Sequence, residues 1–254
     1  MLDQHVIVPE EAETSRLVAR VAEAYGGLDG RALLEPLILR VFRGRVALVS
    51  SFGAESAVLL HMVAGIDRRT PVIFLNTGKL FGETLAYREL LVERLGLADV
   101  RDERPDRSDA GRDDLNGDLW SRDPRACCWI RKVLPLQRSL NGFSAWITGR
   151  KRMHGGLRAG MPLFEMDGDQ VKINPLAGWD GARIAEYMKA HDLPAHPLVK
   201  KGFTSIGCAP CTTPVAAGED HRAGRWRGSD KSECGIHFMD GRPVRAGTGT
   251  VGTE

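Results

Sequence analysis

The order of strands and helices in the first half of the chain constrains the fold more than any other feature of the sequence. Two apolar runs rich in β-branched residues, at 45–53 (RVALVSSFG) and 71–78 (PVIFLNTG), have the composition of buried strands and end in small residues. Helical segments follow them at 55–66 and 82–97. This alternation predicts an α/β fold with a parallel sheet, whose ligands bind beyond the carboxyl ends of the strands.

The rest of the chain contains further helices, one strand and irregular segments. These predicted elements lie at 10–42 (two helices), 129–142 (helix), 144–149 (strand) and 180–194 (helix). The polar stretch 101–126 has little to bury and is interpreted as an excursion between elements. Asp180 is the expected N-cap of the last helix. Beyond residue 211 the periodicity is lost, and the Gly-rich end at 247–254 is predicted to be disordered.

The bulk composition excludes several classes of protein. The chain has 254 residues, and 35 Lys and Arg against 33 Asp and Glu give a net charge of +2, so nothing demands a nucleic acid as partner. No apolar run approaches the roughly 18 residues of a membrane span, and the N-terminus lacks the pattern of a signal peptide. We therefore expect a cytoplasmic protein. In that reducing compartment, five cysteines are better explained as metal ligands plus a reactive thiol than as disulfides.

Small and polar residues follow the first predicted strand, in the sequence SSFGAES. Glycine lets the backbone approach a ligand, while serine hydroxyls and the amides at the start of a helix donate hydrogen bonds to an anion. The predicted phosphate-binding residues are Ser51, Phe52, Gly53, Glu55 and Ser56. The loop matches neither the Walker lysine motif nor the GxGxxG fingerprint. An ordinary strand-to-helix turn would contain the same small residues.

Four of the cysteines are arranged as two close pairs. Cys208 and Cys211 form a CxxC motif, whose spacing allows both thiolates to bind one metal, and the adjacent Cys127 and Cys128 complete a set of four. Adjacent cysteines diverge along a regular backbone, which favours a cluster with separate iron corners over a single zinc ion. The alternative is that Cys127 and Cys128 are small buried apolar residues, as free cysteines commonly are.

The fifth cysteine, Cys234, lies in a polar, basic segment near the C-terminus (KSECGIH). Arg222, Arg225, Arg227 and Lys231 are close in sequence, and such cations lower the pKa of a thiol and increase its thiolate fraction. We therefore predict that Cys234 is a reactive thiol. An exposed cysteine without function is the alternative.

Six motifs together resemble those of the iron-sulfur-containing assimilatory adenylyl-sulfate reductases, thioredoxin-dependent members of the phosphoadenylyl-sulfate reductase family. The motifs are CCWIRKVLPL, WITGRKR, NPLAGW, SIGCAPCTTPV, GEDHRAGRW and KSECGIH. The loop at 51–56 also resembles the pyrophosphate loop of the adenine nucleotide alpha-hydrolase-like superfamily. The resemblance implies that Rossmann-like fold, with a mobile C-terminal tail. At position 76 the related reductases carry aspartate, whereas this chain has Asn76.

The resemblance also implies a cofactor and a reaction. A [4Fe-4S] cluster would be held by Cys127, Cys128, Cys208 and Cys211. The Cys234 thiolate would attack the sulfur of adenosine 5′-phosphosulfate and displace AMP. A thioredoxin or glutaredoxin-like reductant would then release sulfite from the enzyme thiosulfonate, in assimilatory sulfate reduction and cysteine biosynthesis. The tail that carries Cys234 is expected to move between a closed and an open position.

Several cations are expected to serve the anionic substrate. Lys132 is predicted to lie between the cluster and the substrate sulfate, where it would stabilise developing charge. By resemblance, the other substrate-binding residues are Thr77, Gly78, Arg150, Arg152, Arg222 and Arg225. Arginine binds phosphate and sulfate through its planar fork, although a single arginine is more often a solvated surface charge.

The sequence predicts three regions and leaves some questions open. The regions are a helical lead-in at 1–44, a nucleotide-binding and iron-sulfur reductase domain at 45–212, and a flexible tail at 213–254 that carries the catalytic cysteine. One alternative substrate is 3′-phosphoadenosine 5′-phosphosulfate, because LFGET resembles the branch that uses it. A second alternative is a nucleotide-binding redox sensor without turnover. The sequence does not decide whether the chain is a homo-oligomer.

Overall fold

A single six-stranded sheet organises the molecule. The computed structural model describes residues 9–229, 231, 233, 235 and 236, with side chains from residue 12 onward. The strands are β1 Val46–Ser50, β2 Val72–Leu75, β3 Val100–Glu103, β4 Ala145–Ile147, β5 Phe164–Asp167 and β6 Gln170–Ile173. Their order is β3-β2-β1-β4-β6-β5, and every neighbouring pair is parallel except β5 and β6. The predicted α/β fold with a mostly parallel sheet is confirmed.

The central strand β1 shows how the apolar runs build the sheet. Its residue Leu48 pairs in register with Val72 of β2 and with Ile147 of β4. Leu48 faces the larger apolar core of the molecule, whereas its neighbour Ala47 faces a smaller core on the other side. Side chains alternate across a strand, so an apolar run without polar interruptions fits a strand covered on both faces.

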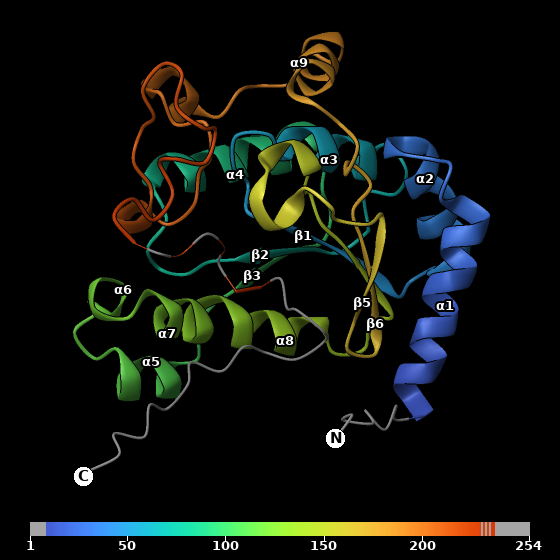
Figure 1. The fold of residues 1–254 in the computed structure, drawn as a ribbon, viewed down its shortest axis with the longest axis horizontal. Coiled ribbons are helices and arrows are strands. Elements are labelled where there is room, and N and C mark those ends of the chain that lie inside the picture. The colour runs from blue at the N-terminus through green and yellow to red at the C-terminus, as the bar shows by residue number, and fades with distance from the viewer. Residues whose placement is uncertain (1–8, 230, 232, 234, 237–254) are drawn as a thin grey trace, which may run out of the picture.

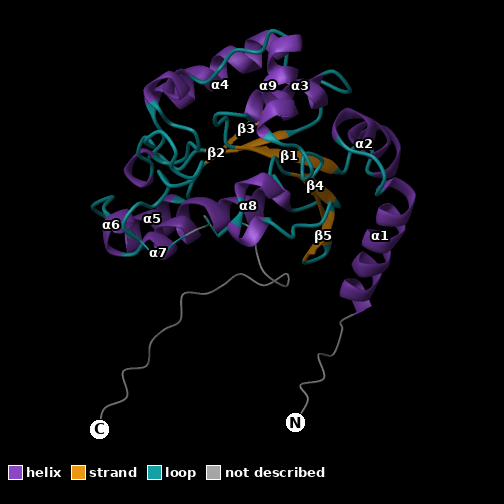
Figure 2. Ribbon diagram, turned by 45° about the horizontal axis from the view of Figure 1, so that its top comes forward, coloured by secondary structure: helices purple, strands orange, loops and turns teal. Residues whose placement is uncertain are grey.

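Helices cover both faces of the sheet (Figures 1 and 2). On one face lie α2 Gly30–Pro36, α3 Ser56–Ala64, α4 Gly82–Leu95 and α9 Gly181–Ala190. On the other lie α5 Arg107–Asp113, α6 Leu119–Arg122, α7 Pro124–Cys128 and α8 Leu134–Leu140. The first helix, α1 Pro9–Tyr25, packs beside the β5–β6 edge. Two π-helical turns, Leu37–Val41 and Trp129–Val133, continue α2 and α7.

Local sequence fixes several helix ends. The Asp180 carboxylate accepts a hydrogen bond from the Arg183 amide, so this residue is the N-cap of α9, as predicted. Asp123 caps α7 in the same way, and its carboxylate accepts from two backbone amides. The C-cap of α4 is Gly96, whose φ of 62° is in the left-handed region that glycine adopts without steric cost.

Two parts of the fold differ from the sequence-based expectations. The polar stretch 101–126 contains most of β3, the helices α5 and α6 and the start of α7. In β3 no residue is fully buried, and α5 has none either, so neither carries the apolar pattern that identifies an element. The β5–β6 hairpin was not predicted either, and β6 supplies a fully buried strand.

The strand order creates a crevice at the carboxyl end of the sheet. The chain leaves β1 toward β2 on one side, while β4 lies on the other side, so the loops after β1 and β4 diverge. Ligands of open α/β sheets bind at such a switch point. Among the described helices, none has both the length and the apolar character needed to cross a membrane.

Candidate active site

A pocket opens at this switch point, between the loops that follow β1 and β4. Of the predicted site residues, it brings together Ser51, Gly53, Glu55, Ser56, Lys132, Arg150, Arg222 and Arg225. Five further titratable residues that were not assigned to the site from the sequence, Lys151, His154, Arg158, His221 and Glu233, also line it. Phe52, Thr77, Gly78 and Arg152 are not among the described residues at its wall.

The loop after β1 is held open by its own hydrogen bonds. The Gly53 amide donates to Oγ of Ser56 at 2.8 Å, and the amide of Phe52 donates to Oγ of Ser50 at 3.2 Å. Phe52 has a φ of 47°, and its buried ring packs edge-on against Phe74. The phenyl group therefore anchors the loop in the core, while Ser56 begins α3 and its side chain lines the pocket.

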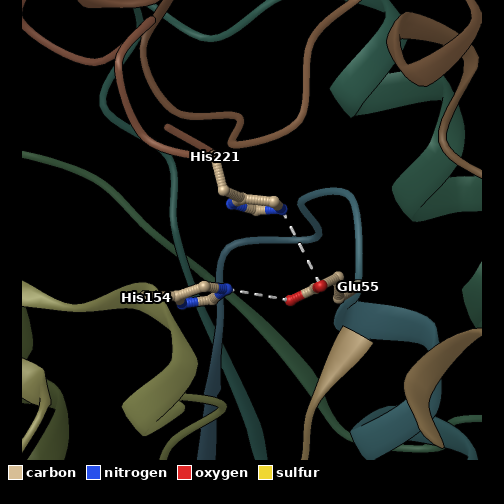
Figure 3. Close-up of side chains that lie close together, drawn as sticks. All are labelled: Glu55, His154 and His221. Carbon is tan, nitrogen blue, oxygen red and sulfur yellow. Dashed lines mark ion pairs between the residues drawn. The ribbon is translucent and has the colours of Figure 1, made fainter. Parts of the chain in front are cut away.

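A carboxylate and two imidazoles meet at one wall of the pocket (Figure 3), and the ammonium group of Lys151 joins them. Oε2 of Glu55 lies 2.8 Å from Nζ of Lys151 and 3.4 Å from Nε2 of His154. The His221 ring stacks on the His154 ring, with centroids 4.8 Å apart and planes tilted by 17°. His221 Nε2 faces Oε1 of Glu55 at 3.9 Å.

The protonation states in this group follow from burial and charge. Burial opposes ionisation of Glu55, but its contact with His154 and the charge of Lys151 outweigh this and lower its pKa to about 2. Burial lowers the pKa of His154 and of His221, which keeps both rings neutral near pH 7. Two stacked rings direct their nitrogen lone pairs side by side, and Lys151 already neutralises the carboxylate. This geometry does not favour a metal ion and forms a rigid polar wall.

The arginines differ in how much of their charge is already compensated. Arg150 forms an ion pair with Glu165, and its Nε donates to Oδ1 of Asn174 at 3.3 Å. Burial lowers the pKa of Arg150. Arg152 donates from Nε to the Met161 carbonyl at 2.8 Å, which directs its guanidinium to a neighbouring loop. Arg150 therefore stiffens the pocket, and Arg152 supports the loop after β4.

Arg158 and Arg222 converge on a carboxylate from the C-terminal segment. Arg158 donates to both oxygens of Glu233, from Nε at 2.5 Å and from Nη2 at 2.8 Å, and Nη2 of Arg222 lies 3.4 Å from Oε2. Arg225 stacks over the Trp226 ring, with its guanidinium carbon 4.3 Å from the centroid. A pocket in which several guanidinium groups gather is suited to a multiply charged anion.

The two cysteine pairs meet beside this pocket, although they are far apart in sequence. Cys127 and Cys128 are buried at the end of α7. Cys208 precedes the single helical turn Ala209–Cys211, and Cys211 is the last residue of that turn. The hydroxyl of Thr77 lies 3.3 Å from Sγ of Cys208. Thr77 and the adjacent Gly78 therefore belong to the surroundings of the cysteines and lie away from the pocket wall.

The charges near the cysteines have opposite effects on different thiols. Burial raises the pKa of Cys127 to about 12, and the charges of Cys128 and Cys208 add to this. Burial would also raise the pKa of Cys208, but Lys132, Thr77 and Arg225 outweigh it and lower that pKa. Lys132 thus lines the anion pocket and also stabilises a thiolate of the cysteine group.

The spacing of the four sulfur atoms bears on the group they could hold. Ligands of one tetrahedral zinc ion lie about 3.8 Å apart, given Zn–S bonds of about 2.3 Å. Among the described residues, no three of the four cysteines bring their sulfur atoms within 4.8 Å of one another. Cys234 lies outside the described residues.

Residues 45–214 match the phosphoadenosine phosphosulfate reductase domain family. The chain belongs to this family. Three relatives are named adenosine 5′-phosphosulfate reductase. The protein of Mesorhizobium japonicum is 51% identical over 84% of each chain, and that of Chelativorans sp. is 50% identical over 90% of this chain and 92% of its own. That of Rhodococcus opacus is 37% identical over 89% and 96%.

Solved structures extend the likeness of this reductase-family chain to the whole fold. Phosphoadenylyl-sulfate reductase from Candida auris, in a phosphate complex, superposes with a TM-score of 0.65 at 22% identity, over 77% of this chain and 96% of that chain. FMN adenylyltransferase from Candida glabrata superposes with a TM-score of 0.52 at 14% identity, over 88% and 76%. At these identities the comparison shows the fold, which is the predicted nucleotide-binding one.

Proposed function

We propose that this protein reduces adenosine 5′-phosphosulfate to sulfite and AMP. The observation that carries the proposal is the position of Lys132, which lines the anion pocket and also stabilises the thiolate of Cys208. Lys132 thus belongs both to the anion pocket and to the surroundings of the cysteines. This arrangement fits the reduction of adenosine 5′-phosphosulfate, which is the activity in the names of the relatives at 51% and 50% identity.

We propose that Cys127, Cys128, Cys208 and Cys211 hold a [4Fe-4S] cluster. The electrostatic influence of each cysteine pair on the other, and the lowered pKa of Cys208, support this assignment. When bound, the cluster would supply a fixed charge distribution next to the substrate and would hold Lys132 in place. The electron pair for the reduction comes from thiols.

The proposed chemistry uses this chain's own residues in two steps. The Cys234 thiolate attacks the substrate sulfur, an S–S bond forms, and the S–O bond to AMP breaks with its electron pair remaining on the phosphate. Lys132, Arg222 and Arg225 stabilise the charge that gathers there. A dithiol of thioredoxin or of a glutaredoxin-like protein then attacks the resulting thiosulfonate, becomes a disulfide, and releases sulfite and the Cys234 thiolate.

We place this reaction in the cytoplasm, because unpaired cysteines and a dithiol donor require a reducing compartment. We also propose that residues 45–212 form the reductase domain, preceded by the helical lead-in 1–44 and followed by the catalytic tail 213–254. The choice of the substrate without a 3′-phosphate is supported by the names of the relatives at 51% and 50% identity.

Anaerobic purification followed by iron analysis and a sulfite assay tests the proposal. We expect about four irons per chain, as four cysteine ligands imply, and thioredoxin-dependent sulfite release from adenosine 5′-phosphosulfate. The variant Cys234→Ser should lose sulfite release but keep its iron and its AMP affinity. A higher kcat/KM for 3′-phosphoadenosine 5′-phosphosulfate would overturn the substrate assignment. Iron and nucleotide binding without turnover would favour the sensor.

A further inference from the structure

Glu233, the residue before Cys234, forms a largely buried ion pair with Arg158. The Glu233 side chain is 16% exposed, and its carboxylate accepts from Nε and Nη2 of Arg158 and is approached by Arg222. The side chains of Arg158 and Arg222 are only 11% and 14% exposed. A charge-assisted bidentate pair with so little exposure fixes the direction of both partners.

Other described residues of the segment attach it weakly. Lys231 donates to the Pro124 carbonyl at 2.9 Å, and Ile236 packs against the smaller apolar core below the sheet. Gly235 has a φ of 79° and approaches Val133. These contacts give the segment a path along α7 and α8, but only Glu233 reaches into the pocket with a charge.

The charge balance at Glu233 explains why the carboxylate is stable there. Burial would raise the pKa of Glu233, but Arg158, Arg222 and Arg150 outweigh it and keep the group ionised. The Arg227–Glu219 pair, whose Arg227 is seven residues before Cys234, has side chains 46% and 33% exposed and lies away from the pocket. The chain therefore contains a buried and an exposed ion pair of the same type.

We propose that Glu233 is a positioning residue, which seats the segment carrying Cys234 on the pocket through Arg158 and Arg222. Arg158 and Arg222 also line the pocket that is proposed to bind the substrate anion. Their guanidinium groups would therefore bind both the Glu233 carboxylate and the substrate. Because Arg158 is held by the carboxylate next in sequence to Cys234, the position of Glu233 and the orientation of the anion site are coupled. This inference rests on the proposed role of Cys234 as nucleophile.

The test compares Glu233→Gln with the matched control Glu219→Gln in the iron-loaded protein. The first readout is the rate at which iodoacetamide modifies Cys234 without nucleotide, mapped by peptide mass spectrometry. The second is single-turnover formation of the protein thiosulfonate from sulfur-labelled adenosine 5′-phosphosulfate. We expect Glu233→Gln to change the modification rate and to slow thiosulfonate formation by about 10- to 100-fold, as loss of alignment does. Glu219→Gln should match the wild type.

Two further measurements separate the possible failures. Glu233→Asp keeps the charge on a shorter side chain and should recover part of the lost rate with unchanged iron content. If Glu233→Gln forms thiosulfonate at the wild-type rate and only binds AMP more tightly, the carboxylate merely competes with the substrate, and the positioning role is wrong. If Cys234→Ser still forms the labelled adduct, the nucleophile assignment itself fails, whatever Glu233 does.

Discussion

Nζ of Lys151 lies 2.8 Å from Oε2 of Glu55, and the two side chains are 4% and 19% exposed. Removing one member of a buried pair leaves the other charge without compensation. Glu55→Gln should therefore lower the free energy of unfolding by about 3 kcal/mol in urea titrations. The exposed Lys201–Glu83 pair provides the control, since solvent screens an exposed ion pair and Glu83→Gln should cost far less than Glu55→Gln. Equal losses in the two variants would contradict the importance of burial at Glu55.

His196 should make the stability of the fold depend on pH. Its fully buried ring accepts from the Leu198 amide at Nδ1, so Nε2 carries the proton and donates to Thr84. Burial lowers the pKa of His196 from 6.5 to about 4. Because the unfolded chain then binds the extra proton, stability is full above pH 6.5 and falls as the pH drops toward 4, by about 1.5 kcal/mol between pH 6.5 and 5.

The variant His196→Gln isolates this contribution. Glutamine does not titrate in this range, so the variant should be less stable at pH 7.5 but should show a smaller loss between pH 6.5 and 5. Urea unfolding of both proteins at the three pH values measures the difference. An identical pH dependence in the two proteins would mean that other groups account for it.

Asn76 is adapted to its neighbour Asp102. Its Nδ2 donates to Oδ2 of Asp102 at 3.1 Å, and its Oδ1 accepts from the Gly78 amide at 3.2 Å. Asn76→Asp would place two carboxylates in contact, and we expect a loss of about 1 to 3 kcal/mol in the free energy of unfolding. The second substitution Asp102→Asn should restore most of it. Unchanged stability in the single variant would show that the loop rearranges at little cost.

Lys132 should matter for the reaction more than for the fold. Lys132→Met removes the cation shared by the pocket and Cys208, and kcat/KM for sulfite release should fall by about 100-fold, as for other groups that stabilise transition-state charge. Lys201→Met, at an exposed ion pair, is the control and should leave kcat/KM unchanged. Iron content should be measured in both variants, because full activity of Lys132→Met with full iron would remove Lys132 from the mechanism.

The sequence predicts those parts of the site that have a recognisable local pattern. The β1 loop was predicted because small residues interrupt a strand pattern, and the cysteine group because CxxC spacing is rare by chance. Arg158 and Glu233 were missed as pocket residues, since a lone charged residue in an irregular segment has no periodic signal. The glycines at 155 and 156 were the only local hint that Arg158 follows a tight loop.

The helical region from α5 to α7 was missed for a related reason. Beside a small apolar cluster around Leu119 and Ile130, a polar contact holds this region: the fully buried Asp114 carboxylate accepts from Nε and Nη2 of Arg131, whose Nη1 donates to the Thr77 carbonyl. The buried charge of Asp114 is compensated by hydrogen bonds from Arg131. The hydropathy of the sequence gives no sign of such a contact. The contact also joins the helix carrying Cys127 and Cys128 to the β2 loop.

Backbone hydrogen bonds connect the turn between Cys208 and Cys211 to two other segments. The Ala209 amide donates to the Lys79 carbonyl at 2.7 Å, and the Trp226 amide donates to the Cys211 carbonyl at 3.0 Å. Gly207 lies directly under the Arg225 guanidinium, where a Cβ would meet it. The position of the two sulfur atoms is therefore tied to the β2 loop on one side and to the Arg225–Trp226 segment of the anion pocket on the other, so a substitution that widened this turn would disturb both sites at once.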